Sequence, residues 1–280
     1  MVDRTPFPSR HCEGALTDAE VLRLREEFPI LGRTTYLVTH SLGAMPRGVH
    51  GALAAYAGAW ETRGVRAWED GWWDMAAEVA GELAPLIGAP AGSVSLHQNV
   101  AVALAVGLSC FEFTGERRRI LYSETEFPSV IYQLEELRRL GAEPVRLGSP
   151  DRSFPCEALL AGIDERTSLV MVSRVVYHSA ELVDLAAIAA RCRETGALLL
   201  VDAYQAAGTV PMVLRAEGVD MAVGGSVKFL LGGPGVGYLY VRPGLTAALR
   251  PRLTGWMAHE RPFAFESDAQ RLRPEGSWRF

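Results

Sequence analysis

Between residues 93 and 240, short apolar runs alternate with amphipathic segments. A short apolar run bounded by turn residues is typical of a buried strand, and apolar positions three or four residues apart are typical of a helix. Strands are expected at the start of 93–109, at 119–123, 141–151, 169–177 and 197–202, and in the apolar run after Gly235. Helices are expected at the end of 93–109 and at 129–140, 155–163 and 183–195. This alternation predicts right-handed βαβ units, and therefore a three-layer α/β/α protein with a mostly parallel central sheet.

The patterns before residue 90 are weaker. Thr17 followed by Glu20 is a helix-capping signal, which predicts a helix over 17–29. Residues 34–46 predict a short strand and then a Ser-Leu-Gly turn, and residues 47–87 predict two helices. The second of these helices carries the closely spaced Trp68, Trp72 and Trp73. These tryptophans are expected to pack in the core or at an interface, and the alternative is a pocket for an aromatic substrate.

The composition indicates a globular protein without affinity for nucleic acid. Hydrophobic residues make up 49% of the 280 residues, and the net charge is −5 with an isoelectric point near 5.8. The densest basic run, Arg117–Arg119, is too short for a binding stripe. No apolar run is long enough to cross a bilayer, and residues 1–14 lack the apolar region of a secretory signal. A cytoplasmic protein without a nucleic-acid or membrane partner is therefore expected.

The cysteines stand far apart and show neither CxxC nor zinc-type Cys/His spacing. They are Cys12, Cys110, Cys156 and Cys192. Reduced thiols and no metal site are expected.

The stretch 219–240 carries the first candidate for chemistry. Lys228 has apolar neighbours on both sides, including Val227 and Phe229, and a glycine-rich turn follows at 232–235. An apolar setting lowers the pKa of a lysine and makes its amine a nucleophile, whereas a solvated surface charge is the alternative. The commonest use of such an amine is a covalent bond to an aldehyde cofactor.

The second candidate is the acid that ends the apolar run ALLLVD at 197–202. The pattern predicts a buried parallel strand with Asp202 at its C-terminal end, where ligands bind in open α/β sheets. A lone aspartate after a strand is more often a helix N-cap. An aspartate combined with an apolar-embedded lysine, however, fits pyridoxal phosphate, which needs a lysine for its aldehyde and an acid for its pyridinium nitrogen.

Six segments in order extend this picture over nearly the whole chain. They are YLVTHSLGAMP (36–46), RGVRAWEDGWW (63–73), EFPSVIY (126–132), LLLVDAYQAAGTVP (198–211), KFLLGGPG (228–235) and GWMAHE (255–260). Together they resemble the class V aminotransferase superfamily of fold-type I pyridoxal phosphate enzymes, and most of all kynureninase and its relatives. The resemblance implies the fold-type I large domain, an amino-acid substrate, and a homodimer whose active sites lie between subunits.

The resemblance also implies roles for individual residues. Lys228 would bond to the cofactor and take the substrate α-proton, Asp202 would hold the pyridinium proton, and Phe127 would stack on the ring. The turn at Asn99 and Val100 would receive the phosphate at a helix start. Further cofactor contacts are implied for Ser129, Ser173, Gln205, Ser226 and Trp256. Structural alternatives stay open: a plain helix start at Asn99, a hydrophobic staple at Phe127, and a packed surface side chain at Trp256.

Some positions depart from the kynureninase pattern. Asn99 and Val100 stand where a hydroxyl residue is common, Gln205 stands where histidine is frequent, and Val227 replaces a phosphate-binding tyrosine. Ser226, one place earlier, could supply a hydroxyl instead. These changes bear on kynureninase activity more than on cofactor binding.

Three regions are expected: residues 1–35 as an N-terminal arm and helix, 36–255 as the cofactor-binding large domain, and 256–280 as the start of a truncated C-terminal segment. The family resemblance implies a small C-terminal domain that commonly supplies the arginine for the substrate carboxylate. Arg279 is expected to be a solvated terminal charge rather than that ligand.

The resulting hypothesis is a pyridoxal phosphate enzyme that hydrolyses the Cβ–Cγ bond of an amino acid such as kynurenine. The same machinery also serves transamination, elimination, cysteine desulfurisation and epimerisation, so these alternatives stay open. A truncated homologue with a binding or structural role is a further alternative. A nucleotide-binding Rossmann protein is disfavoured, because no GxGxxG follows the first strand.

Overall fold

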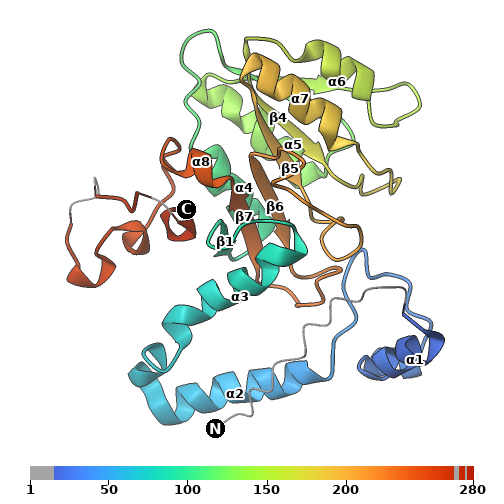
Figure 1. Cartoon of the computed structure of the whole chain (residues 1–280), viewed down its shortest axis with the longest axis vertical. Helices are drawn as coiled ribbons and strands as arrows, with labels where there is room; N and C mark the ends of the chain where they lie inside the picture. The colour runs from blue at the N-terminus through green and yellow to red at the C-terminus, as the bar shows by residue number, and fades with distance from the viewer. Residues whose placement is uncertain (1–15, 268–270, 275) are drawn as a thin grey trace.

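A seven-stranded sheet forms the centre of the computed structural model, which describes residues 16–267, 271–274 and 276–280 (Figure 1). The strands are β1 (Val94–His97), β2 (Arg119–Ser123), β3 (Glu143–Leu147), β4 (Thr167–Ser173), β5 (Leu198–Asp202), β6 (Met221–Gly225) and β7 (Gly237–Val241). Their order in space is β1-β7-β6-β5-β4-β2-β3. Neighbouring strands are parallel except that β7 runs antiparallel to both β1 and β6. The prediction of a mostly parallel sheet is confirmed.

Helices cover both faces of this sheet. The α-helices are α1 (Asp18–Glu26), α2 (Gly48–Arg63), α3 (Trp72–Leu86), α4 (Val100–Leu108), α5 (Pro128–Glu136), α6 (Cys156–Gly162), α7 (Leu185–Thr195) and α8 (Pro243–Thr246). Short 3-10 turns are η1 (Pro29–Gly32), η2 (Gly64–Trp68), η3 (Leu137–Leu140), η4 (Trp256–Ala258), η5 (Pro262–Ala264) and η6 (Ser277–Arg279).

Alternation along β4 shows how the three layers arise. Leu169 and Met171 pack in one core with α4 and α5, whereas Val170 and Val172 pack in a second core with α3, α6 and α7. Successive side chains of a strand point to opposite faces, so a strand buried on both faces reads as a continuous apolar run. The three-layer α/β/α prediction is confirmed.

Helices α1 and α2 lie outside these layers. Helix α1 begins with the predicted capping box between Thr17 and Glu20. Neither α1 nor α2 has a buried residue. Figure 1 shows α2 beyond the far end of α3, away from the sheet.

The strand predicted at the start of 34–46 does not form. Leu37 is 79% exposed, and within the described residues this segment pairs with no strand. The segment is instead an irregular loop, in which the Gly43 N–H donates to the Val227 carbonyl at 2.7 Å. Local pattern predicts strand propensity, but a strand also needs a partner to satisfy its backbone groups. The strand predicted over 169–177 likewise ends at Ser173, after which the backbone turns away.

The C-terminal residues pack against the sheet domain, and one prediction about them is wrong. Arg279 is buried rather than solvated, because its guanidinium donates to the Leu249 carbonyl at 3.1 Å and to the Arg273 carbonyl at 2.5 Å. The proposed boundaries after residues 35 and 255 stay predictions, and residues 1–15 lie outside the described part.

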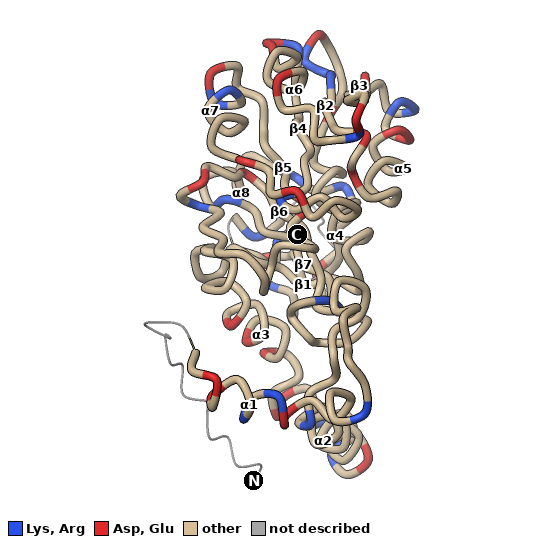
Figure 2. Tube along the Cα trace, turned by 90° about the vertical axis from the view of Figure 1, so that its right-hand side faces the viewer, with Lys and Arg blue, Asp and Glu red and all other residues tan. Residues whose placement is uncertain are grey.

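The charges are mixed in sign. Figure 2 shows Lys and Arg interspersed with Asp and Glu around α5, α6, α7 and β3. No helix of the described residues is long and apolar enough to span a bilayer. In the same residues, no three His, Cys, Asp or Glu side chains gather in a metal-binding arrangement. Cys110, Cys156 and Cys192 are free thiols, and Cys12 lies outside the described part.

Candidate active site

A cavity of about 460 Å³ opens where β4 and β5 end side by side. Ser173 ends β4, Asp202 ends β5, and the two residues lie directly opposite each other in the parallel register. Both residues line the cavity. Carboxyl ends of parallel strands are the ligand-binding edge of such sheets, so the strand-end prediction for Asp202 is confirmed as geometry.

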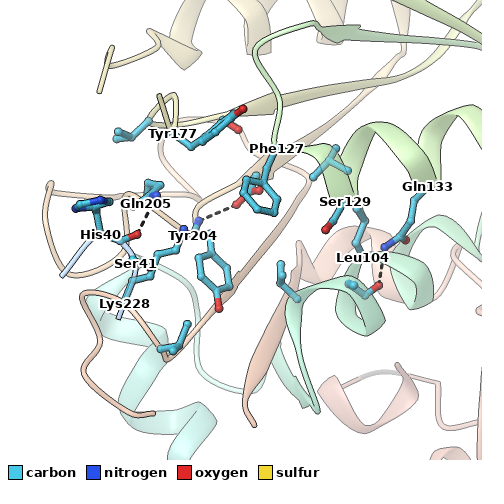
Figure 3. Close-up of a pocket in the computed structure, with 17 residues that line it drawn as sticks. His40, Ser41, Leu104, Phe127, Ser129, Gln133, Tyr177, Tyr204, Gln205 and Lys228 are labelled. Atoms are coloured by element: carbon cyan, nitrogen blue, oxygen red, sulfur yellow. Dashed lines mark hydrogen bonds between the residues drawn. The ribbon is translucent and has the colours of Figure 1, made fainter. Parts of the chain in front are cut away.

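Lys228 enters this cavity from the loop between β6 and β7. It is the only lysine in the 280 residues. Its Nζ lies 4.6 Å from the ring centroid of Tyr204 and 5.8 Å from that of Phe127, and Figure 3 shows the three side chains around the cavity. Burial lowers the pKa of Lys228, while the charge of Asp202 acts in the opposite direction. A partly desolvated amine of lowered pKa is more nucleophilic than a surface lysine.

The Asp202 carboxyl group is buried and held in place. The Tyr204 N–H donates to its Oδ1 at 2.8 Å. Burial raises the pKa of Asp202 to about 6, and the opposing effects are the Tyr204 hydrogen bond and the charge of Lys228. Asp202 and Lys228 line the same cavity, and among the ion pairs of the described residues none joins the two directly.

Phe127 provides an apolar wall at the start of α5. It is the N-cap residue, with extended backbone, and its side chain is 44% exposed. Its ring meets that of Tyr177 edge to face at a centroid distance of 5.2 Å. Because the exposed ring faces the cavity, Phe127 is available to cover the face of a flat ligand.

The start of α4 forms another wall of the cavity. Val100 and Ala101 line it, and because they lie in the first turn of the helix, their N–H groups have no carbonyl acceptor within it. The Asn99 side chain accepts from the Val102 N–H at 3.0 Å, so it caps the helix instead of entering the cavity. A Cβ on Gly237 would lie 2.3 Å from the Asn99 carbonyl carbon, so only glycine lets β7 pack this closely against the turn.

Two loops close the cavity around Lys228. The Gln205 side chain donates to the His40 carbonyl at 3.2 Å, as Figure 3 shows. Gly43 packs so tightly that a Cβ there would lie 2.3 Å from the Lys228 carbonyl oxygen. His40, and Ser41 of the Ser-Leu-Gly turn, line the cavity.

The structure brings together most of the predicted site residues. Those that line the cavity are Val100, Phe127, Ser129, Ser173, Asp202, Gln205 and Lys228. Asn99, Ser226 and Trp256 do not line it. The Ser226 hydroxyl donates to the Gly233 carbonyl at 2.8 Å and supports the turn after Lys228. Trp256 instead stacks on Phe265, with ring centroids 5.3 Å apart.

The predicted tryptophans also lie elsewhere. Trp68 and Trp73 stack with centroids 4.5 Å apart, and Trp72 stacks on Tyr56 at 4.8 Å. None of them lines the Lys228 cavity. Their contacts with one another and with Tyr56 agree with the expected packing role, and the alternative of a substrate pocket stays open.

Sequence reasoning missed three polar residues at or beside the cavity. Tyr204 presents its ring to Lys228, and Gln133 lines the opposite wall while donating to the Ala101 carbonyl at 3.0 Å. Glu126 lies behind the wall, where both its oxygens contact Ser173. Tyr204 follows the strand-end aspartate by two residues, and this spacing was an available signal. The burial of Glu126 left no trace in the sequence.

The family of the chain can now be stated. The family model described as "Aminotransferase class-V" matches residues 62–273. The chain belongs to this family. The resemblance predicted from six segments is thereby confirmed, and so is pyridoxal phosphate as the cofactor of the family.

Curated relatives are about a third identical to this class V chain over the aligned residues. Kynureninase from Pseudomonas fluorescens is 33% identical over 251 residues, which are 87% of this chain and 60% of that protein. "Uncharacterized aminotransferase YcbU" from Bacillus subtilis (strain 168) is 33% identical over 257 residues, which are 89% of this chain and 66% of that protein. The chain therefore spans less than two thirds of the length of these relatives.

Solved structures share the fold. A mutant of C-DES with glycine covalently linked to its PLP cofactor has a TM-score of 0.79 and 22% identity, covering 91% of this chain and 68% of that one. The apo cysteine desulfurase from Thermococcus onnurineus NA1 has a TM-score of 0.77 and 19% identity, covering 92% of this chain and 65% of that one.

The residues of the cavity fit pyridoxal phosphate. A primary amine, a buried acid, the exposed ring of Phe127 and a helix start surround a space of about 460 Å³. Pyridoxal phosphate needs an amine at its aldehyde and an acid at its ring nitrogen, and Lys228 and Asp202 supply these two groups to the same cavity.

Proposed function

We propose that this chain holds pyridoxal phosphate in the Lys228 cavity and uses it to transform an amino acid. The observation that supports this most strongly is the convergence of Lys228, Asp202 and Phe127, which come from three separate elements, on one cavity. When bound, the cofactor supplies a ring that accepts electrons from the substrate α-carbon. The side chains and N–H groups around the cavity would bind the cofactor, orient it, exclude water and transfer protons.

Each residue then has a distinct task. Lys228 would bond to the cofactor aldehyde, and its free amine would take or return a proton at Nζ. Asp202 would accept a hydrogen bond from the protonated ring nitrogen. Phe127 would cover the ring and exclude water from it. The N–H groups of Val100 and Ala101 would bind the phosphate at the positive end of the α4 dipole.

The single lysine makes the test of this proposal unusually direct. Pyridoxal phosphate is added, the adduct is reduced with borohydride, and the intact protein and its peptides are weighed by mass spectrometry. Reduction is expected to fix one cofactor on Lys228, with the N-terminal amine as the only other primary amine in the sequence. Lys228→Arg is the matched control, because it keeps the positive charge without a primary amine. An unmodified Lys228 peptide in wild-type protein that is folded by circular dichroism would refute the proposal.

We further infer hydrolytic Cβ–Cγ cleavage of a kynurenine-like amino acid. The phenylalanine at position 127, which the kynureninase resemblance implies, supports this reaction within the family, and a kynureninase is among the relatives at 33% identity. Incubation with kynurenine is expected to release anthranilate and alanine. Release of a keto acid would indicate transamination, and release of sulfide from cysteine would indicate desulfurisation. A trapped cofactor with no turnover of any amino acid would favour the inactive homologue.

A homodimer is the assembly we propose for this enzyme, and the exposed face of α2 supports it. Leu53 is 62% exposed and Trp60 is 65% exposed, and Val65, just beyond the helix, is 80% exposed. Trp60 and Val65 line one hollow together with Tyr56 and Trp68, and Leu53 lies on the same helix as Trp60; these five residues are called the apolar ledge here. Exposed large apolar side chains that gather on one part of a surface are typical of an interface.

Sedimentation of the wild-type protein and of Trp60→Glu tests the dimer. The wild type is expected to sediment as a dimer and the variant to dissociate at micromolar concentration. Tyr132→Glu, on the exposed surface of α5, is the control, because Tyr132 is 72% exposed and far along the chain from the ledge. A wild-type monomer, or a variant dimer of unchanged stability, would contradict the α2 interface.

A further inference from the structure

Glu126 is a buried acid that the proposed function does not use. It is 1% exposed and lies between the end of β2 and the start of α5, next to Phe127. Its two carboxyl oxygens contact a single residue: the Ser173 N–H is 3.0 Å from Oε1, and the Ser173 Oγ is 2.6 Å from Oε2. Among the ion pairs of the described residues, none includes Glu126.

Ser173 connects this acid to the candidate active site. It faces Asp202 across the β4–β5 pair and lines the cavity beside it. Two residues in register on neighbouring parallel strands present their side chains to the same face of the sheet. Glu126, Ser173 and Asp202 therefore form a row of polar groups that leads from the interior to the cavity.

The charges of this row do not balance if both acids are ionised. Asp202 is 7% exposed and is opposed by Lys228, whereas Glu126 has no cation of its own. A buried charge without a counter-ion is strongly disfavoured, and a second negative charge nearby disfavours it further. One of the two acids must then keep its proton, and it is the acid that lacks the cation.

We propose that Glu126 is a positioning residue that remains protonated, leaves the negative charge to Asp202, and makes Ser173 a hydrogen-bond donor to the cavity. This proposal rests on the proposed function only for the identity of the ligand that receives the bond. A neutral Glu126 donates from Oε2 to the Ser173 Oγ, while its Oε1 accepts from the Ser173 N–H. The Ser173 hydroxyl hydrogen is then free to point into the cavity. An ionised Glu126 instead accepts the hydrogen of the Ser173 hydroxyl, so that the Ser173 oxygen can only accept hydrogen bonds from the ligand.

The electrostatics of the surrounding groups agree with this assignment. The pKa of Glu126 is raised to about 8, because burial, together with the charge of Asp202, outweighs the opposing hydrogen bonds from Ser173. The pKa of Asp202 is raised by burial to about 6, against the opposing effects of the Tyr204 hydrogen bond and the charge of Lys228. The groups that face Glu126 are Ser173 from β4 and Asp202 from β5, with Lys228 beyond Asp202. Both directions favour the proton on Glu126 and the negative charge on Asp202.

Infrared spectroscopy of the protein without cofactor tests the protonation directly. A protonated carboxyl group has a C=O stretching band separate from those of ionised acids. This band is expected in the wild type and in Asp202→Asn at neutral pH, and it is expected to disappear in Glu126→Gln. It should also fade as the pH rises through about 8. The proposal would be overturned if the wild type lacked the band. It would also be overturned if Asp202→Asn lost the band while Glu126→Gln kept it.

Cofactor affinity measured against pH tests the consequence for Ser173. Glutamine mimics the neutral acid, because its amide donates from one atom and accepts at the other. Between pH 7 and 9, the affinity of the wild type for pyridoxal phosphate is expected to fall about five- to ten-fold further than that of Glu126→Gln. This factor corresponds to the free energy of one hydrogen bond. In Ser173→Ala this difference should vanish. Equal pH profiles for wild type and Glu126→Gln would refute the role of Ser173 as a donor.

The two proposals fail in different ways. If pyridoxal phosphate does not bind, no variant yields a borohydride-trapped adduct, yet the infrared band still reports on Glu126. If the cofactor binds to Lys228 and the infrared band is missing, the proposed function stands and the role of Glu126 is wrong.

Discussion

Replacing Glu126 by glutamine is expected to abolish a loss of stability that the wild-type protein shows as the pH rises. The folded protein holds the Glu126 proton more tightly than the unfolded chain, because its pKa is raised from 4.5 to about 8. The stabilisation from this group is therefore complete below the unfolded pKa and is lost as the pH rises through the folded one. Glutamine has no proton to lose, so its contribution does not change over this window.

The size of the effect follows from the two pKa values. Between about pH 5.5 and pH 8, linkage predicts that the wild type loses on the order of 3 kcal/mol of unfolding free energy through Glu126. Asp202, with a pKa raised to about 6, adds a loss in the lower part of this range. That loss occurs in both proteins, so the difference between them isolates Glu126.

Urea denaturation followed by tryptophan fluorescence at several pH values measures this difference. The wild-type midpoint should fall relative to that of Glu126→Gln as the pH rises, with equal m-values. Glu136→Gln is the control, because Glu136 is exposed at the end of α5 and its ion pair with Arg139 is a surface contact. Parallel pH profiles for wild type and Glu126→Gln would refute the assignment of the proton to Glu126.

Three further substitutions test other parts of the molecule. Asp202→Asn is expected to keep the trapped adduct on Lys228 but to lower turnover on the order of a hundred-fold, measured by steady-state kinetics, because the amide does not hold the ring proton; unchanged turnover would contradict the role of Asp202. Gly237→Ala places a Cβ 2.3 Å from the Asn99 carbonyl carbon. It is expected to lower the free energy of unfolding by about 1–3 kcal/mol in urea denaturation and to weaken cofactor binding. Unchanged cofactor affinity would contradict phosphate binding at the start of α4. Asp220→Ala removes the buried carboxylate that accepts from the Leu199 N–H at 2.9 Å and from Arg242 at 2.9 Å. The free energy of unfolding from urea denaturation is expected to fall by about 2 kcal/mol. An unchanged unfolding free energy would show that water replaces these hydrogen bonds.

The sequence predicted the sheet domain because its strands are buried on both faces. A run such as 197–202 needs no knowledge of its neighbours to be recognised as a central strand, and each such run in the second half of the chain forms one. The exception at 34–46 shows the limit of this reasoning. Leu37 and Val38 have strand-like side chains, but the pattern does not reveal whether a neighbouring strand exists to pair with them.

The candidate site was predictable where a residue type is rare for a physical reason. A lysine among apolar residues and an acid at a strand end are both costly without a task, so Lys228 and Asp202 stood out. Glu126 did not, because an acid in a turn is ordinary unless the fold buries it. The capping role of the Asn99 side chain was an open alternative in the sequence, and the hydrogen bond to Val102 favours it.

The departures from the kynureninase pattern have a common consequence for phosphate binding. Val227 contributes its carbonyl to the Gly43 N–H, a contact that needs no particular side chain, so the tyrosine expected there is lost without cost to the loop. Ser226, the hydroxyl next to Val227 in the sequence, already donates to the Gly233 carbonyl. In the proposed complex, the phosphate would therefore depend more on the N–H groups at the start of α4, where Val100 has no hydroxyl to add. Binding that depends on main-chain groups depends on backbone placement. In this chain, Gly237 is therefore expected to matter more for cofactor affinity than any single side chain near the phosphate.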